Sequence, residues 1–501
     1  MFPTSRVTDT PGPGFKPREA HHGRRSQDNA QPARRPSQLQ SLFEQQKAAF
    51  RRHPYPSAEE RKEHLARIKP MLLDNLDRIT DALNKDFGGR SPDETKIAEV
   101  LTSLEGIKYY SKRLRKFMKP QKRKTGSMGF PGSAQVIYQP VGVVGVIVPW
   151  NYPLYLAIGP LLAALAAGNR VMIKMSEATP HAGALLEELI GKTFSADHVT
   201  VVNGEVEVGA AFSRLPFDHL LFTGSTSVGR HIMRAAAENL TPVTLELGGK
   251  SPTIIGPDFP MQDAVERIAF GKCFNAGQTC VAPDYVMCPR SRVDEFIDAF
   301  GAQVGSMYPT MVNNQDVTSV INDRQYQRLQ GYLTDARAKG ARIVEINPGN
   351  EDFSNTRKMP FTLVLDVTDD MKIAQDEIFG PLMIVQPYDD IDQAINYIND
   401  RPRPLALYYF DWNSERANYV MTHTHSGGAC LNDTMSHVGI DDIPFGGVGD
   451  SGMGHYHGPE GFYTFSKGKG VFRKGRINAT RNILPPFGNR MHGFIYKFLM
   501  K

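Results

Sequence analysis

The sequence predicts an α/β protein that contains two doubly wound domains, in each of which helices cover a mostly parallel sheet. Two observations support this prediction. Between residues 143 and 246, short β-branched and aliphatic runs alternate with helical segments, and the connections between them are short. After residue 250 a second series of the same kind follows. Such alternation is typical of right-handed βαβ units, which place their strands parallel in one sheet.

The length and composition agree with an ordinary globular protein. The chain has 501 residues, of which 41% are hydrophobic and 22% charged. At about 150 residues per domain this length suggests two or three domains. The four cysteines form no CxxC pair and have no close Cys/His spacing, so we expect no disulfide scaffold and no metal site. A reducing, cytoplasmic location fits this cysteine usage best.

The formal net charge of +5 is unevenly distributed. Residues 1–37 carry seven basic and three acidic residues, and residues 467–501 carry nine basic residues and no acid, which leaves −8 for residues 38–466. Because the body is acidic, a nucleic-acid partner is not indicated. The first 37 residues are rich in Pro, Gly and Arg, lack the apolar core of a secretory signal, and are expected to be a disordered basic tail.

The elements can be justified in chain order. Residues 38–118 have apolar residues at helical spacing among charges. Residues 136–169 contain no charge and resemble a membrane span, but glycines and prolines divide them into a strand at 143–148, a loop at 149–153 and a helix at 154–167. We therefore expect no stable membrane insertion.

The remaining elements follow the same alternation. Strands are expected at 170–174, 199–202, 219–222 and 243–246, with helices at 180–190, 206–213 and 225–237 between them. The second series contains a helix at 261–274, a strand at 284–289 and a helix at 294–308, before a glycine-rich return at 446–454. Ligands of such sheets bind beyond the carboxyl ends of the strands, where Asn151, Lys174, Gly224 and Glu246 are expected.

Cys280 is the cysteine best placed to act as a nucleophile. It follows FNAGQT, a polar, small-residue sequence that ends a helix, whereas Cys273, Cys288 and Cys430 fit buried structural positions. A thiol attacks only as the thiolate, so it needs a lowered pKa or a nearby base.

Glu246 is a candidate for that base. It ends an apolar strand and precedes two glycines, a setting in which burial raises the pKa of a carboxyl group towards neutrality. A salt bridge to Lys250 is an equally good interpretation of this strand by itself.

Two further strand ends suggest a nucleotide. The run FTGSTSVG at 222–229 opens a helix whose free N–H groups could attract a phosphate, although its spacing is neither GxGxxG nor a P-loop. Lys174 and Glu177 could bind the hydroxyls of a ribose, with the acid disfavouring a 2′-phosphate; a solvated charge pair is the simpler interpretation.

Together these motifs resemble the aldehyde dehydrogenase family over residues 38–480. Seven stand in the family's order: PWNYP at 149–153, KMSE at 174–177, FTGSTSVG at 222–229, LELGGKSP at 245–252, FNAGQTC at 274–280, EIFGP at 377–381 and PFGG at 444–447. The stretch from 216 to 252 is similar to the bacterial coniferyl aldehyde dehydrogenases. The resemblance implies oxidation of an aldehyde to the acid, with NAD as cofactor; NADP is left open because Met175 and Ser227 depart from the commonest pattern.

The resemblance also implies residue roles. Cys280 would attack the aldehyde, Asn151 would hold the oxyanion and Glu246 would activate water. Trp150 and Phe445 would line the substrate pocket. The residues implied for cofactor binding are Lys174, Glu177, Gly224, Ser225, Thr226, Ser227, Val228, Gly229, Glu377 and Phe379.

The implied organisation has five parts and a homodimer as assembly. Beyond the tail at 1–37, these are an NAD-binding domain at 38–246, whose residues 120–138 join an oligomerisation arm, a catalytic domain at 247–432, a return segment and oligomerisation strand at 433–481, and a C-terminal extension at 482–501.

Three other functions remain open. The first is a dehydrogenase for medium and long-chain fatty aldehydes. The second is a cysteine hydrolase without cofactor, which would leave the motifs at 174–177 and 222–229 unused. The third is a nucleic-acid or membrane-surface binder that uses the basic ends, where aromatic and basic residues alternate only within 485–498.

Overall fold

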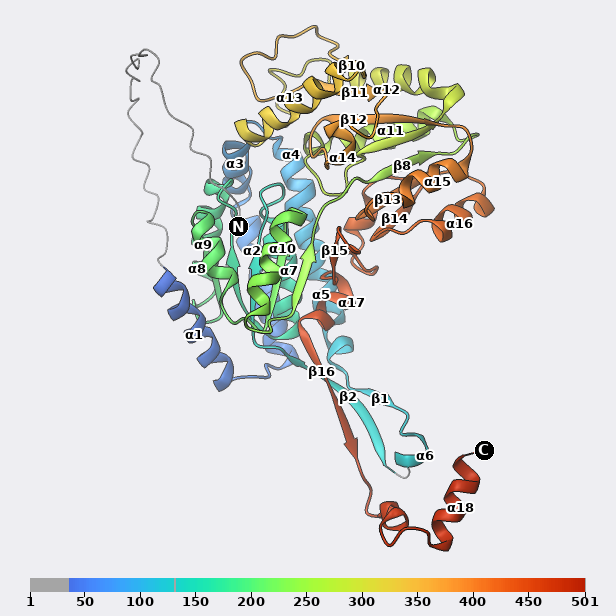
Figure 1. Ribbon diagram of the computed structural model, residues 1–501. Helices are drawn as coiled ribbons and strands as arrows, with labels where there is room; N and C mark the ends of the chain where they lie inside the picture. The colour runs from blue at the N-terminus through green and yellow to red at the C-terminus, as the bar shows by residue number, and fades with distance from the viewer. Residues whose placement is uncertain (1–35, 130–131, 501) are drawn as a thin grey trace, which may run out of the picture. The chain divides into compact units, whose positions relative to one another are not determined.

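Three sheets organise the computed structural model, which describes residues 36–129 and 132–500 (Figure 1). A six-stranded sheet has the order β15-β7-β6-β3-β4-β5, a seven-stranded sheet the order β10-β11-β12-β9-β8-β13-β14, and a three-stranded sheet the order β1-β2-β16. In the two larger sheets only the edge strands β15 and β10 run antiparallel to their neighbours. The predicted α/β class with two doubly wound sheets is confirmed.

Helices account for the N-terminal region, as predicted. They are α1 (Pro36–Arg52), α2 (Ala58–Leu73), α3 (Leu76–Phe87), α4 (Pro92–Thr95) and α5 (Thr102–Met118), with a π-helical turn at Lys96–Leu101. The predicted tail at 1–37 lies outside the described residues except for its last two, which begin α1. Ser57 and Glu60 form a capping box at the start of α2, which fixes where that helix begins.

The six-stranded sheet is covered on both faces. Its strands are β3 (Val143–Ile147), β4 (Arg170–Lys174), β5 (Val199–Val202), β6 (His219–Thr223), β7 (Val243–Glu246) and β15 (Gly452–Met453). The helices between them are α7 (Tyr155–Ala167), α8 (Pro180–Thr193), α9 (Val206–Ser213) and α10 (Thr226–Ala237). Side chains alternate along each strand: Val171 and Ile173 pack in the core that contains α7 and α8, whereas Met172 packs with residues of α1 and α9.

The uncharged segment 136–169 is not a single helix. It contains the end of β2, all of β3, a loop and α7. Residues 163 to 167 of α7 are fully buried, and the helix contacts α2, α5 and α17 (Gly458–Thr464) as well as the sheet. Burial on every side explains its uniformly apolar sequence. No helix among residues 36–129 and 132–500 is long and apolar enough to cross a membrane.

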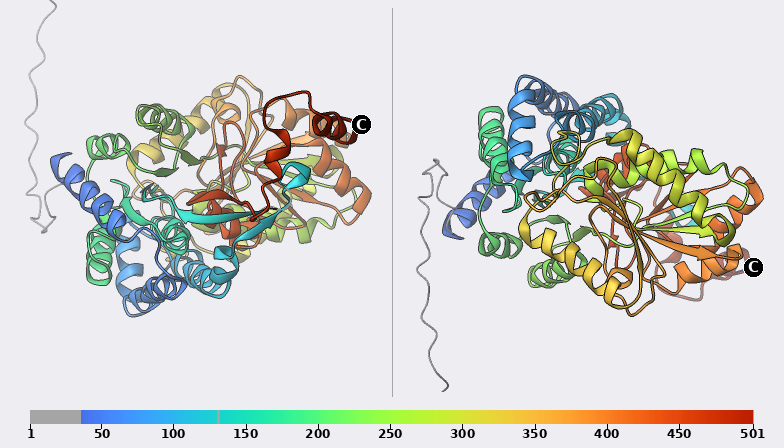
Figure 2. Two further views of the ribbon diagram at one scale, coloured as in Figure 1. Left: turned by 90° about the horizontal axis from the view of Figure 1, so that it is seen from below. Right: turned by 90° about the horizontal axis from the view of Figure 1, so that it is seen from above.

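The chain enters the seven-stranded sheet after β7. The strands of this sheet are β8 (Pro252–Ile255), β9 (Tyr285–Pro289), β10 (Arg342–Ile346), β11 (Phe361–Leu365), β12 (Leu382–Tyr388), β13 (Ala406–Phe410) and β14 (Gly428–Leu431). Its helices are α11 (Met261–Cys273), α12 (Val293–Met307), α13 (Asp323–Ala338), α14 (Lys372–Gln375), α15 (Ile391–Asn399) and α16 (Ser414–His423), and they lie on both sides of the strands (Figure 2). The sheet-to-sheet passage at 246–252 is consistent with the predicted domain limit, but the domain limits remain predictions.

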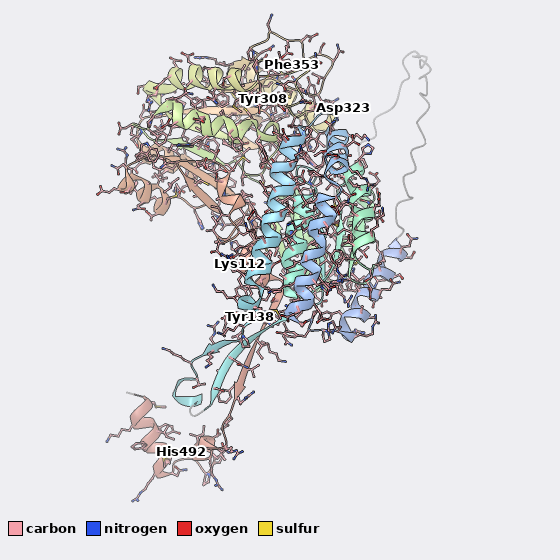
Figure 3. The ribbon with its side chains drawn as sticks, turned by 180° about the vertical axis from the view of Figure 1, so that it is seen from behind. Lys112, Tyr138, Tyr308, Asp323, Phe353 and His492 are labelled. Carbon is pink, nitrogen blue, oxygen red and sulfur yellow. The ribbon has the colours of Figure 1, made fainter. Side chains whose placement is uncertain are left out.

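The third sheet extends away from the other two (Figure 1). It consists of β1 (Gln121–Arg123), β2 (Ser133–Pro140) and β16 (Ser466–Arg473), with the short α6 (Gly126–Gly129) between the first two strands. At its base Tyr138 packs on Tyr463 with ring centroids 4.6 Å apart (Figure 3). The C-terminal extension ends in α18 (Arg490–Leu499), which carries His492 (Figure 3).

The strand order of the six-stranded sheet locates the ligand site. From β3 the chain adds β4 and β5 on one side and then β6 and β7 on the other, so the order reverses between β3 and β6. Ligands of doubly wound sheets bind beyond the carboxyl ends of the strands at such a reversal.

Candidate active site

A cavity of about 490 Å³ lies at the carboxyl ends of β3, β6 and β7. Segments from both larger sheets contribute to its wall, because residues of α13 and of the loop after α14 line it together with the ends of these strands. The lining residues are Pro149, Trp150, Asn151, Thr223, Gly224, Ser225, Thr226, Ser227, Glu246, Leu247, Gly248, Cys280, Gln325, Arg328, Asp376, Glu377 and Phe379. The structure therefore brings Cys280, Glu246 and Asn151 together at one cavity.

Cys280 follows a strained turn. Asn275, Ala276 and Gly277 have φ values of 52°, 51° and 70°, all in the left-handed region. Such backbone concentrates at functional sites because the surrounding structure has to hold it in place. Burial, together with the charges of Glu377 and Glu246, raises the pKa of the Cys280 thiol to about 12. The thiol is therefore protonated near neutral pH and depends on a base.

Glu246 has the properties expected of that base. It ends β7 and is 3% exposed, and neither carboxylate oxygen has a hydrogen-bond partner among the described residues. Burial raises the pKa of this carboxyl group well above its ordinary value. The alternative salt bridge to Lys250 does not form; Lys250 pairs instead with Asp284. An unpaired buried carboxylate is available to accept a proton from a ligand or water.

Asn151 lies in the loop after β3 and is 3% exposed. Its main-chain carbonyl accepts hydrogen bonds from Arg90 Nη1 and from Asn275 Nδ2, each at 3.2 Å. These bonds leave its side-chain amide at the cavity wall, where it can donate to an anionic oxygen.

The start of α10 forms one side of the cavity. Ser225 is the N-cap residue, but its hydroxyl does not cap the helix and instead lies 3.1 Å from the hydroxyl of Ser227. The first-turn N–H groups are thus available to a phosphate. Val228 and Gly229, predicted to bind the cofactor, do not line the cavity. Gly229 packs against Leu247, and a Cβ atom there would lie 2.8 Å from that side chain, so close helix-to-sheet packing explains this glycine.

Lys174 and Glu177 also lie outside the cavity lining. Lys174 ends β4 and is buried, and its Nζ donates to the carbonyl of Met175 at 2.6 Å. Burial lowers its pKa. Glu177 is exposed, and no ion pair joins the two side chains among the described residues, so the simple charge pair is not formed. Their binding to a ribose stays a prediction.

Glu377 and Phe379 lie across the cavity from the strand ends. A carboxylate oxygen of Glu377 accepts a hydrogen bond from the N–H of Gly249 at 3.1 Å, and a Cβ atom at residue 248 would collide with the same carboxylate. Burial raises the pKa of Glu377 to about 8. Phe379 packs edge-on against Trp150, with ring centroids 5.2 Å apart. Trp150 therefore lines the cavity beside Phe379, a predicted cofactor residue.

Phe445, predicted to line the substrate pocket, lies outside the lining of this cavity. It is buried, and its ring stacks on His457 with centroids 5.1 Å apart, next to Tyr456. The aromatic side chains of the return segment surround its ring, and its place in the wall of the substrate pocket stays a prediction.

Sequence reasoning missed several residues that shape the site. Arg328 lines the cavity and donates from Nη2 to the carbonyl of Ile378 at 2.7 Å, which holds the segment that carries Glu377. Arg90 lies just before α4 and donates a hydrogen bond from Nη1 to the carbonyl of Asn151. A lone charge inside a helical pattern usually indicates a solvent-facing position, so no local signal marked either arginine.

Comparison with known proteins now decides the family. A model of the aldehyde dehydrogenase family matches residues 28–471, which is most of the chain. The chain belongs to the aldehyde dehydrogenase family.

Relatives of this aldehyde dehydrogenase agree with the assignment. A Pseudomonas aeruginosa protein named "Probable coniferyl aldehyde dehydrogenase" is 57% identical over 465 residues, which cover 93% of this chain and 97% of that protein. A substrate-bound structure of Staphylococcus aureus AldH has a TM-score of 0.87 and 36% identity, covering 92% of this chain and 99% of that one. A Mycobacterium tuberculosis aldehyde dehydrogenase in complex with NAD+ has a TM-score of 0.80 and 32% identity, covering 91% and 92%.

Proposed function

We propose that this aldehyde dehydrogenase oxidises an aromatic aldehyde, coniferyl aldehyde or a close analogue, to its acid with NAD. The convergence of Cys280, Glu246 and Asn151 on the cavity that also contains the start of α10 supports the reaction. The name of the Pseudomonas aeruginosa relative, at 57% identity, supports the substrate class.

The cavity fits a dinucleotide. The free first-turn N–H groups after Ser225 suit a pyrophosphate, and the Glu377 carboxylate beside Gly249 suits a ribose hydroxyl. Lys174 and Glu177 are proposed to hold the second ribose, and Gly224, Thr226 and Ser227 to surround the phosphates. When bound, NAD supplies the acceptor for the hydride that leaves the former aldehyde carbon.

The protein's own side chains carry out the other steps. The Cys280 sulfur attacks the carbonyl carbon, and ionised Glu246 accepts the thiol proton. The oxyanion that forms is stabilised by the Asn151 amide and the Cys280 backbone N–H. After hydride loss a thioester remains on Cys280. Glu246 first releases the thiol proton to solvent. It then takes a proton from a water molecule whose oxygen attacks the thioester; the carbon–sulfur bond breaks, the acid is released, and the departing sulfur regains a proton from Glu246.

Replacing Cys280 with alanine tests this assignment. We expect Cys280→Ala to abolish NADH formation with coniferyl aldehyde, while NAD still binds, because Cys280 supplies none of the phosphate or ribose contacts proposed for NAD. A panel of aromatic and medium to long-chain aliphatic aldehydes, each with NAD and NADP, ranks the substrates. Retained turnover in Cys280→Ala, or product formation in the wild type without any nicotinamide, would contradict the proposal.

We also propose a cytoplasmic homodimer. The four cysteines, Cys273, Cys280, Cys288 and Cys430, are all free, which suits a reducing compartment. β14 and β16 are edge strands with one unpaired side each in the described part of the chain, and a partner subunit can protect both edges by pairing β16 with β14. Light scattering of the full chain and of a chain ending at residue 465 tests this, because the shorter chain is expected to be monomeric.

A further inference from the structure

A buried ion pair lies behind the loop that carries Asn151. Arg90 and Glu99 have side chains with no exposed surface, and Arg90 Nη1 lies 2.8 Å from Glu99 Oε1. The Arg90 guanidinium also lies over the rings of Phe87 and Tyr152, at 4.8 Å and 5.1 Å from their centroids. Removing two charges from water costs free energy that a buried pair seldom regains, so such a pair is weak evidence for stability. Its position suggests another purpose.

The pair holds the Asn151 loop at two points. Arg90 Nη1 donates to the Asn151 carbonyl at 3.2 Å. Glu99 Oε2 accepts from the N–H groups of Leu154 and Tyr155 at 2.6 Å and 3.1 Å, where α7 begins. These N–H groups have no partner inside the helix, and a carboxylate at a helix start is stabilising. The loop is thus fixed at its carbonyl and at its exit.

A second set of contacts ties this loop to the nucleophile. Asn275 Nδ2 donates to the carbonyls of both Asn151 and Gln278, each at 3.2 Å. The backbone N–H of Asn275 donates to Glu94 Oε1 at 2.8 Å, which helps to hold its left-handed conformation. Thr279, which directly precedes Cys280, also contacts this loop, because its hydroxyl lies 2.7 Å from the hydroxyl of Tyr152.

We propose that Arg90, Glu99 and Asn275 are positioning residues that fix the Asn151 amide relative to the Cys280 sulfur. This inference rests on the proposed function, because it assigns Asn151 to the oxyanion. Oxyanion stabilisation depends on donors placed within tenths of an ångström, so loosening the Asn151 main chain weakens it without touching the cofactor side of the cavity.

A double-mutant cycle tests the inference. Removing one oxyanion donor costs about 10²–10³ in kcat, and we expect Arg90→Met to lower kcat by about 10-fold or more with an unchanged dissociation constant for NAD. In an Asn151→Ala background, Arg90→Met should lower kcat by less than about 3-fold, since the amide that it positions is gone. Equal losses of kcat in the two backgrounds would overturn the inference.

Arg61 provides a matched control. It is another buried arginine, and its Nη1 donates to the carbonyls of Ala166 and Ala167 at the opposite end of α7. Arg61→Met should lower the thermal midpoint while the folded enzyme keeps its kcat. A loss of kcat like that of Arg90→Met would show that general loosening of α7 is the cause and would overturn the proposal.

Asn275→Gly keeps the proposal testable if Arg90→Met does not fold. Glycine adopts the left-handed conformation without strain and retains the N–H bonded to Glu94, so only the side-chain bonds to Asn151 and Gln278 are lost. We expect the same non-additivity with Asn151→Ala; additive losses contradict the inference. Absence of NAD-dependent oxidation in the wild type would instead refute the proposed function.

Discussion

Replacing Glu246 with glutamine should impair both steps of the reaction that need a base. The substitution keeps the volume of a side chain that is 3% exposed, and it breaks no hydrogen bond of the carboxylate within the described residues. What it removes is the ability to accept a proton. The Cys280 thiol then has no base to take its proton before it attacks the aldehyde, and the thioester has no base to activate water.

The expected magnitude follows from the missing base. A positioned general base contributes about 10²–10⁴-fold, so steady-state kcat should fall by that factor in Glu246→Gln. The first turnover should also release NADH more slowly than in the wild type, because the protonated Cys280 thiol has lost the base that accepts its proton.

The assay measures NADH absorbance after rapid mixing. The enzyme concentration is high enough for one NADH per active site to be detected. Mass spectrometry of the quenched wild-type enzyme should show the acyl group on the peptide that contains Cys280, and the variant should acquire it more slowly. Steady-state turnover within about 3-fold of the wild type, or a first turnover as fast as that of the wild type, would refute the role given to Glu246.

The same variant should be more stable at alkaline pH. Burial raises the pKa of Glu246 in the folded protein, so the unfolded chain loses this proton first as the pH rises. The buried carboxyl group therefore lowers the free energy of unfolding of the wild type at pH values above the ordinary pKa of a glutamate. Below that pKa it does not lower it. Calorimetry should show a higher unfolding temperature for Glu246→Gln at pH 8 and no difference near pH 4; the reverse order would contradict the assigned burial.

Three further outcomes follow from the structure. The rising limb of kcat against pH should lie above the range of an exposed glutamate, because Glu246 must be ionised to act; a profile that is flat between about pH 5 and pH 8 would contradict this. Burial lowers the pKa of Lys272, whose Nζ has no hydrogen-bond partner in the described chain, to about 8. Lys272→Met should therefore stabilise the protein by up to about 3 kcal/mol at neutral pH in denaturant titrations. This stabilisation should disappear as the pH rises towards the ordinary pKa of a lysine. Gly229→Ala should destabilise it by about 1–3 kcal/mol through contact with Leu247, seen as a lower thermal midpoint; an unchanged midpoint would contradict the close packing.

Much of the fold could be predicted because its signals are local. The strands Val199–Val202 and Val243–Glu246 and the helix Val206–Ser213 have the bounds expected from the sequence. In each case a buried β-branched run or a short helical period is bounded by glycine, proline or polar residues. The helix predicted at 180–190 instead continues through Gly191 to Thr193.

The site was predictable where a residue ends a strand. Glu246, Asn151 and Gly224 follow strands, and parallel strands bring their carboxyl ends to one edge. Contacts between distant helices gave no such signal. Arg90 and Glu99 look like solvent-facing charges in a helical pattern, and only packing against the loop at Asn151 removes them from water.

Phe445 and Gly229 show a different limit. Each belongs to a motif that predicts ligand contact, yet the structure uses Gly229 for close packing on Leu247 and buries Phe445 against His457. A motif indicates that a segment is near a site; which of its side chains face the ligand depends on the packing around it.

The antiparallel strand β15 has a consequence for the order of biosynthesis. Gly452 pairs with Glu246, although the chain between them, residues 247–451, includes the entire seven-stranded sheet. The sheet edge beside Glu246 is therefore completed only after about nine tenths of the polypeptide has been made. A nascent chain that already exposes Cys280 has not yet enclosed Glu246, so the thiol and its base become a working pair only in the finished protein.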